Sequence, residues 1–127
     1  MKFGFIACLL LAAQSASAAE FDITKFGATP NDTSDDTSAI EDAFAACGKA
    51  GGGTVFIPSG TFIISRRGPE SPILEVPSNT TIRGEGNASI IKYDPKVNQS
   101  NFWRMIGAPV KGGCTNVVIR DLHLDGS

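Results

Sequence analysis

From residue 54 onward the sequence repeats one pattern, in which short apolar segments alternate with turns rich in Gly, Pro, Asn and Asp. None of these segments is longer than about six residues, which is a typical length for strands and too short for most helices. The expected strands are residues 54–57, 61–64, 73–76, 80–83, 88–92, 116–120 and 122–125. Many short strands separated by turns suit a sandwich, a barrel or a solenoid.

Internal repetition favours the solenoid among these three folds. Pro58–Ile63 and Pro77–Ile82 share four of six residues and lie 19 residues apart. Asn79–Arg83 matches Asn116–Arg120 at close to twice that spacing. A period near 19 residues predicts a β-solenoid, in which each coil stacks on the preceding one. Residues 54–127 would then form at most about four coils.

One amphipathic helix is expected before the first coil, over about residues 37–48. Its apolar stripe comprises Ile40, Ala43, Phe44 and Cys47. Ser38, followed three residues later by Glu41, predicts a capping box at the start, and Gly48 or the Gly51–Gly53 run would end the helix. We expect this helix to cover the first coil as an N-terminal cap, because an open solenoid end exposes unpaired backbone and apolar core.

Residues 1–19 have the organisation of a secretory signal peptide. Lys2 precedes the apolar stretch Phe3–Ala13, and the small residues that follow predict cleavage after Ala18 or Ala19. A buried N-terminal helix is the alternative interpretation. We therefore expect a secreted protein, either extracellular or periplasmic.

Charge, hydropathy and cysteine content indicate which classes of partner and which cysteine states this chain can have. The net charge of −2 argues against a nucleic-acid partner, which requires a basic face. No apolar stretch reaches the roughly 18 to 20 residues needed for a membrane span. Beyond the leader, Cys47 and Cys114 would either pair in an oxidising compartment or remain as two free thiols.

Five segments of the chain resemble the N-terminal portion of the pectate lyase superfamily, in particular its rhamnogalacturonase/epimerase-like and polygalacturonase-like members. The segments are Ile23–Ala28, Asp35–Ile40, Gly51–Phe62, Pro77–Gly86 and Asn116–Gly126. The resemblance implies an all-β fold, a right-handed parallel β-helix. The chain would then divide into the leader at 1–19, the N-terminal cap with its helix at 20–53, and the first coils at 54–127. Because no closing cap follows the last expected strand, we expect the chain to be truncated at its C-terminus.

The resemblance further implies an extracellular polysaccharide as the partner, often one that contains uronic acids. It leaves lyase, glycoside hydrolase and epimerase chemistry unseparated, because the catalytic residues of such enzymes lie on later coils. A non-catalytic carbohydrate-binding protein or adhesin, or a solenoid like a phage tailspike, is the alternative. No cofactor is evident in this segment, although calcium, used by some pectate lyases, is conceivable in the full-length protein. A chain that truly ended here would be expected to form a homo-oligomer to cover its last coil.

Two pairs of residues are candidates for chemistry. His123 and Asp125 lie two residues apart on an expected strand whose Leu122 and Leu124 would point inward, so both should face outward, as an acid–base pair or as a solvated surface. Arg83 and Arg120 occupy equivalent repeat positions and would form a column, two coils or about 10 Å apart. Guanidinium groups suit the carboxylates of a polyuronate, and a solubilising surface is the alternative.

Adjacent carboxylates at Asp35 and Asp36 have a structural explanation. Glycoside hydrolases need two carboxyl groups roughly 5 to 10 Å apart across the scissile bond. Neighbouring acidic residues at a helix start are better suited to accept backbone N–H bonds, and we expect both to act as caps. One histidine and two cysteines do not make up a zinc site, so no metal site is expected in this segment.

Overall fold

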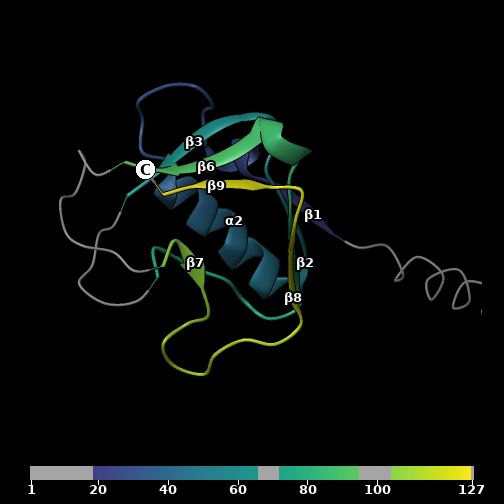
Figure 1. The fold of residues 1–127 in the computed structure, drawn as a ribbon. Helices are drawn as coiled ribbons and strands as arrows, with labels where there is room; N and C mark the ends of the chain where they lie inside the picture. Colours follow the sequence, from purple (N-terminus) through teal and green to yellow (C-terminus); the bar gives the residue numbers. More distant parts are fainter. Residues whose placement is uncertain (1–18, 66–71, 95–103, 127) are drawn as a thin grey trace, which may run out of the picture.

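Three parallel sheets form the three sides of a coil (Figure 1) in the computed structural model, which describes residues 19–65, 72–94 and 104–126. The helices are η1 (Ile23–Phe26), α2 (Thr37–Lys49) and η2 (Gly86–Ala88). The strands are β1 (Glu20–Asp22), β2 (Gly53–Phe56), β3 (Gly60–Ile64), β4 (Leu74–Glu75), β5 (Thr80–Arg83), β6 (Ser89–Tyr93), β7 (Ile106–Gly107), β8 (Val117–Arg120) and β9 (His123–Asp125).

From β2 onward, consecutive strands enter different sheets, and this is what makes the fold a parallel β-helix. Sheet A has the order β1-β2-β5-β8, sheet B has β3-β6-β9, and sheet C has β4-β7. Every neighbouring pair is parallel, so the chain returns to each side in the same direction after one turn. The predicted solenoid is therefore confirmed, and β1 already belongs to its first side.

The predicted short period is wrong. Thr54 pairs with Thr81, and Thr81 pairs with Val118, so the chain returns to sheet A only after a longer stretch than the short repeat predicts. The two matching segments of that repeat lie on different sheets, since Gly60 begins β3 in sheet B and Thr80 begins β5 in sheet A. Each full coil contains three strands and their corners, so it needs more residues than the short repeat allows.

The match between these two segments reflects a shared corner geometry. Gly60 and Asn79, which occupy the same place in the two segments, both have positive φ, at 133° and 59°. Asn116 repeats the corner one coil later with φ of 58°, and its side-chain Nδ2 donates to Oδ1 of Asn79 over 3.1 Å. Gly52 occupies the same corner position one coil before Asn79. A Cβ atom on Gly52 would lie 2.4 Å from the Asn79 carbonyl oxygen. Only glycine fits there.

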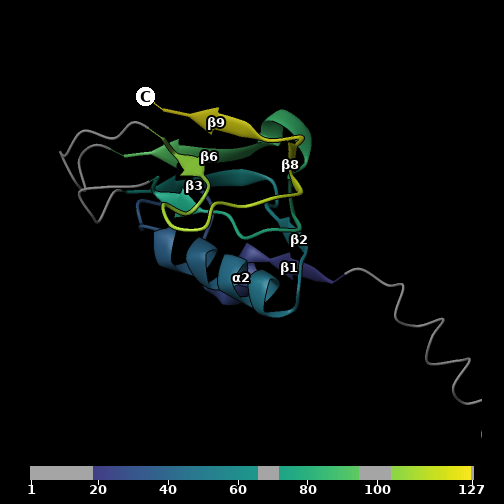
Figure 2. The ribbon, with the colours of Figure 1, turned by 90° about the horizontal axis from the view of Figure 1, so that it is seen from below.

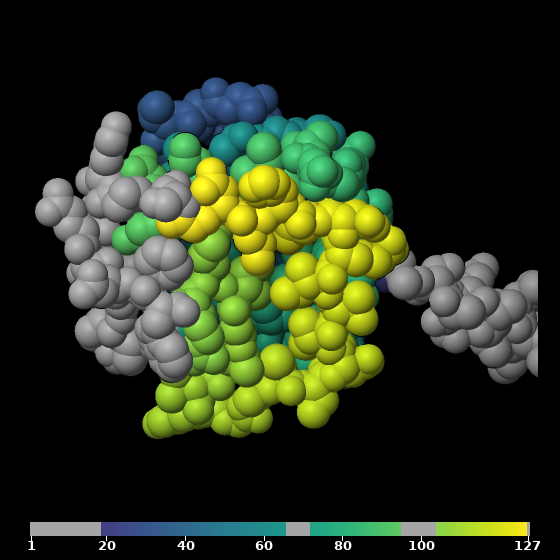
Figure 3. Space-filling model, in the orientation of Figure 1, coloured from purple at the N-terminus to yellow at the C-terminus, as the bar shows by residue number. Residues whose placement is uncertain are grey.

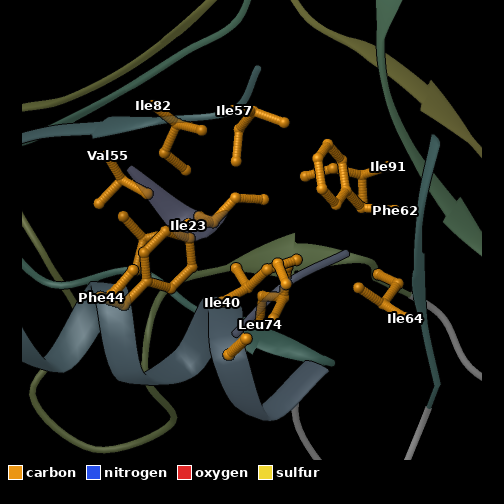
Figure 4. Close-up of a cluster of buried hydrophobic side chains, with 14 of the residues drawn as sticks. Ile23, Ile40, Phe44, Val55, Ile57, Phe62, Ile64, Leu74, Ile82 and Ile91 are labelled. Carbon is orange, nitrogen blue, oxygen red and sulfur yellow. The ribbon is translucent and has the colours of Figure 1, made fainter. Parts of the chain in front are cut away.

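Helix α2 lies across the end of the stack opposite β9 (Figure 2). All four residues of the predicted apolar stripe are buried. Figure 4 shows Ile40 and Phe44 of α2 among the core side chains, which include Ile23 from η1, Val55 from β2 and Ile82 from β5. The helix thus closes the core at this end, because its apolar face takes the place that a further coil would occupy.

The start of α2 differs from the prediction. The helix begins at Thr37 with Asp36 as the N-cap residue, so Ser38 lies inside the first turn and the predicted Ser38–Glu41 capping box is wrong. Asp35 accepts a hydrogen bond from the Thr37 backbone N–H over 3.0 Å, which agrees with its predicted capping role. This bond places a carboxylate at the positive end of the helix, before the position that the capping box would use.

Asp36 does not cap the helix with its side chain, contrary to the prediction. Its carboxylate is 3% exposed and accepts backbone N–H bonds from Thr29 and from Ile63, each 3.0 Å long. Its own backbone N–H donates to the Ile63 carbonyl over 2.7 Å. One buried carboxylate therefore joins the loop before α2, the start of α2 and strand β3.

Both cysteines within the described residues, Cys47 and Cys114, are free thiols. Cys47 is buried, with its Sγ 3.5 Å from the Oγ1 of Thr80, and Cys114 is half-buried. Of the two alternatives left open by the sequence, the structure has the unpaired one.

Substitution of Phe44 by Asp tests the packing of α2. Phe44 is 3% exposed, and a carboxylate at this position would be buried without a partner. We expect the free energy of unfolding, measured by urea denaturation, to fall by several kcal/mol. Ala45→Asp on the exposed side of the same helix is the control and should lower it only by the helix-propensity cost of about 0.7 kcal/mol. Equal stability of the two variants would contradict the packing described here.

The pH dependence of stability tests Asp36. Burial raises the pKa of this carboxyl above its ordinary value of 3.8. The two backbone N–H bonds act in the opposite direction and lower the pKa, whereas the nearby charges of Asp32 and Asp35 raise it by a smaller amount. The folded chain therefore holds this proton more tightly than the unfolded chain does. The resulting stabilisation is complete below pH 3.8 and is lost as the pH rises through the raised pKa.

The measurement is urea unfolding at a series of pH values for the wild type and Asp36→Asn. We expect the wild type's advantage in unfolding free energy to shrink as the pH rises above about 4. Asp42→Asn, on the exposed side of α2, is the control and should follow the wild type. An advantage that stays constant or grows with pH would contradict the account of Asp36.

Candidate functional site

The candidate residues lie on the outward faces of sheets A and B. Side chains alternate along each strand, so that one set fills the core and the other faces away from it. In sheet A, Val55 and Ile82 are fully buried, whereas their strand neighbours Phe56 and Arg83 are half-buried on the outer face. The register then stacks outward residues of successive coils into columns.

Arg83 and Arg120 are direct neighbours in such a column, because β5 pairs with β8 and the two residues are register partners. The predicted separation of two coils is therefore wrong, and the strand spacing of about 4.8 Å applies to their backbones. Phe56 of β2 is the next member of the column, in register with Arg83. We call Phe56, Arg83 and Arg120 the arginine column.

Each arginine of the column contacts a carboxylate. Arg83 donates from Nη2 to Oε2 of Glu20 over 2.9 Å, and its guanidinium carbon lies 4.4 Å from the centre of the Phe56 ring. This cation–π contact restrains the Arg83 side chain on the outer face of the sheet. Arg120 donates from Nη1 to Oδ2 of Asp121 over 3.1 Å, and both side chains are 55% exposed.

His123 and Asp125 lie on the outward face of sheet B, in register with Ile90 and Lys92 of β6. The structure places the two on one side of β9, as the sequence analysis expects, with His123 exposed and Asp125 half-buried. Leu124 between them is the register partner of the buried Ile91, yet it is 43% exposed because it belongs to the last coil. The histidine pair and the arginine column belong to different sheets.

The last coil leaves part of the core uncovered. In Figure 3 the segments that carry β8 and β9 and the segment that carries β7 surround a hollow, in which atoms of an earlier coil are visible. Ile119, the register partner of the buried Ile82, is 45% exposed. Inward-facing apolar residues are thus open to solvent at this end, whereas α2 covers their counterparts at the other end.

Within the three described ranges, no group of three or more His, Cys, Asp or Glu side chains is arranged to hold a metal ion. In the same part of the chain, no helix has the length and apolarity needed to cross a membrane.

Two contacts of Arg83, with Phe56 and with Glu20, are not predicted by the sequence analysis. Phe56 and Glu20 belong to coils that precede Arg83, and the offset between β2 and β5 was not visible as an identity in the sequence. Alignment of Thr54–Phe56 with Thr81–Arg83 by their inward residues, Val55 and Ile82, would have placed Phe56 below Arg83. Nothing local to Glu20 indicates its ion pair, because it spans two strand positions across sheet A.

Comparison with known proteins gives one family. A family model described as rhamnogalacturonase A/epimerase, pectate lyase-like, matches residues 21–123. The chain is 37% identical over 112 residues to mannuronan C5-epimerase AlgE3 of Azotobacter vinelandii, a match that covers 85% of this chain and 6% of the relative. It is 38% identical over 74 residues to an exopolygalacturonase of Zea mays, covering 58% of this chain and 17% of the relative.

A solved structure shows the same similarity in three dimensions. The A-module of mannuronan C5-epimerase AlgE6 from Azotobacter vinelandii superposes with a TM-score of 0.75 and 31% sequence identity. The match covers 84% of this chain and 28% of that module. The chain therefore spans only a minor part of the proteins that it is similar to.

Proposed function

The chain belongs to the rhamnogalacturonase A/epimerase, pectate lyase-like family, and we propose that it is the N-terminal part of a secreted enzyme that acts on a uronic-acid polysaccharide. The observation that carries this proposal is the 37% identity to a mannuronan C5-epimerase over 112 residues. The relatives act on polysaccharides, and the superposition on an epimerase A-module supports a common fold for this segment.

C5 epimerisation is the reaction that we favour for the whole enzyme. Inversion at C5 of a uronate requires removal of the C5 proton, which is adjacent to the carboxylate, and return of a proton to the opposite face. A lyase begins with the same proton removal and then expels the oxygen at C4, so it is the second candidate. Both reactions need a positioned base and groups that stabilise negative charge on the carboxylate as the proton leaves.

The described segment contributes structure rather than the reacting groups in this proposal. Its first coils and α2 would close one end of the solenoid, and its outward columns would continue along the later coils. His123 and Asp125 offer an imidazole beside a carboxylate, but both lie on an outward sheet face, where His123 is exposed. A general base is most effective in a site that excludes water, so we assign these two residues to the solvated surface.

Incubation with polymannuronate tests the proposed reaction. Proton NMR would follow conversion of mannuronate to guluronate, and ultraviolet absorbance would follow the unsaturated ends that a lyase produces. We expect neither signal from the 127-residue chain alone, and guluronate without unsaturated ends from a longer protein that contains it. Turnover by the chain alone would overturn the placement of the site, and a longer protein active only on neutral polysaccharides would overturn the substrate class.

Substitution of His123 by Gln separates the two interpretations of this residue. We expect the longer protein to keep its epimerisation rate within about twofold, because a surface histidine supplies no proton transfer. Loss of an acid–base catalyst typically lowers the rate by about 10² to 10⁴. A decrease of that size, with the thermal unfolding of the variant unchanged, would assign His123 to the reaction instead.

We further propose that the protein is exported and that its leader is removed after Ala18. Ala16 and Ala18 supply the small residues that signal peptidase reads at −3 and −1. The Ala19 carbonyl accepts a hydrogen bond from the Thr54 backbone N–H over 2.9 Å, at the edge of the β1–β2 pair. Cleavage after Ala18 keeps this bond, whereas cleavage after Ala19 removes the acceptor.

The intact mass of the exported protein tests this proposal, and we expect an N-terminus at Ala19. Chains engineered to begin at Ala19 and at Glu20 provide the physical comparison. The second should be less stable by roughly 1 kcal/mol, because the Thr54 N–H loses its partner. A chain that begins at Ala18 is the control and should match the first. An exported protein that begins at Glu20, or that retains its leader, would refute the assignment.

A further inference from the structure

We propose that the outward face of sheet A is a binding surface for the carboxylate groups of a uronic-acid polysaccharide, contacted through Arg83 and Arg120. This proposal rests on the proposed function, which supplies the class of ligand. It concerns a contact surface on the first coils and makes no use of reacting groups.

The positive charges of Arg83 and Arg120 repel each other. Arg83 and Arg120 are register partners on adjacent strands, with a backbone spacing of about 4.8 Å. Like charges directly opposite each other in a sheet are destabilising. A carboxylate that accepts hydrogen bonds from both guanidinium groups would relieve this repulsion, and the planar fork of arginine matches carboxylate geometry.

The acidic residues that already contact the two arginines, Glu20 and Asp121, form exposed ion pairs. Glu20 and Asp121 are 52% and 55% exposed, and exposed ion pairs contribute only about 0 to 1 kcal/mol. A carboxylate from a ligand can therefore replace either one at little cost. The six outward positions of β2, β5 and β8 are Thr54, Phe56, Thr81, Arg83, Val118 and Arg120. These six include two cations and no carboxylate, whereas β1 adds the outward carboxylates of Glu20 and Asp22 at the edge of the sheet. The part of the face that attracts anions is therefore the part formed by β5 and β8.

The Arg83 side chain is preorganised for binding by its contact with Phe56. The Phe56 ring, 4.4 Å from the guanidinium carbon, restrains the Arg83 side chain before any ligand arrives. Less side-chain freedom is then lost on binding, which favours affinity. Thr54 and Thr81 form the neighbouring outward column and are half-buried, with hydroxyl groups suited to the hydroxyls of a sugar chain. The face therefore combines charged and neutral hydrogen-bonding groups in one strip.

Calorimetric titration of the purified protein with a mannuronate hexamer tests the surface, with a neutral mannose hexamer as the reference ligand. We expect Arg120→Gln to weaken binding of the mannuronate hexamer by roughly tenfold, since a charge-assisted hydrogen bond is lost. Arg120→Lys keeps the charge but not the fork, and we expect it to lose most of the same affinity. Lys92→Gln removes one positive charge from the outward face of sheet B and is the matched control, expected within twofold of the wild type.

Glu20→Gln gives a change in the opposite direction. It removes the carboxylate that competes for Arg83, so we expect binding of the mannuronate hexamer to become several times tighter. A purely structural role of the ion pair predicts equal or weaker binding. This variant keeps the test informative if substitutions at Arg83 itself, which also contacts Phe56, impair folding.

The outcomes separate this proposal from the proposed function. Equal weakening by Arg120→Gln and Lys92→Gln, or unchanged binding in Arg120→Gln, would overturn the surface while leaving the enzymatic proposal intact. Wild-type affinity in Arg120→Lys would overturn the role of the guanidinium fork. Binding that follows the expected pattern, together with a longer protein that does not turn over uronates, would overturn the enzymatic proposal alone.

Discussion

In-register pairing of parallel strands from successive coils is the interaction on which the rest of this structure depends. It fixes the position of each residue relative to the residue one coil earlier, so apolar residues stack on apolar residues, as Val55, Ile82 and Ile119 do. The same pairing stacks the outward side chains into columns. Any ligand surface on this fold is therefore built from residues that are distant in sequence and adjacent in space.

The corners keep this register. Gly52, Asn79 and Asn116 all adopt positive φ, and the two asparagines are joined by a side-chain hydrogen bond. Asparagine tolerates the left-handed region better than other residues with a Cβ atom, and glycine is needed where the carbonyl of the next coil comes close. A turn that directs the chain into sheet A at the same height in each coil makes the pairing of β2, β5 and β8 repeatable.

The two ends of the stack are closed in different ways. At the N-terminal end α2 supplies an apolar face, and Asp36 holds the start of that helix against β3 with backbone hydrogen bonds. At the other end Ile119 and Leu124 are each more than two-fifths exposed. Physical closure of one end by a helix means that coils can be added to this stack in one direction only.

Much of this fold could be predicted from local sequence patterns, because burial acts on alternation and helical spacing. The short strands and the apolar stripe of α2 are visible in this way. The period was not, since the same turn chemistry at Gly60 and Asn79 serves two different corners and produces a false short repeat. The roles of Asp36 and Glu20 depend on partners in distant segments, Ile63 and Arg83, and no local pattern records such contacts.

The unequal lengths of the two complete coils have a consequence for how this architecture varies. The interval from Thr81 to its register partner Val118 is longer than the interval from Thr54 to Thr81, yet the pairing in sheet A is unbroken. The connections into and out of sheet C absorb most of the difference: segments 65–73 and 76–79 around β4 give way to the longer segments 94–105 and 108–116 around β7. Insertions near sheet C therefore leave the columns of sheets A and B in place, so one side can diversify while the others keep the frame.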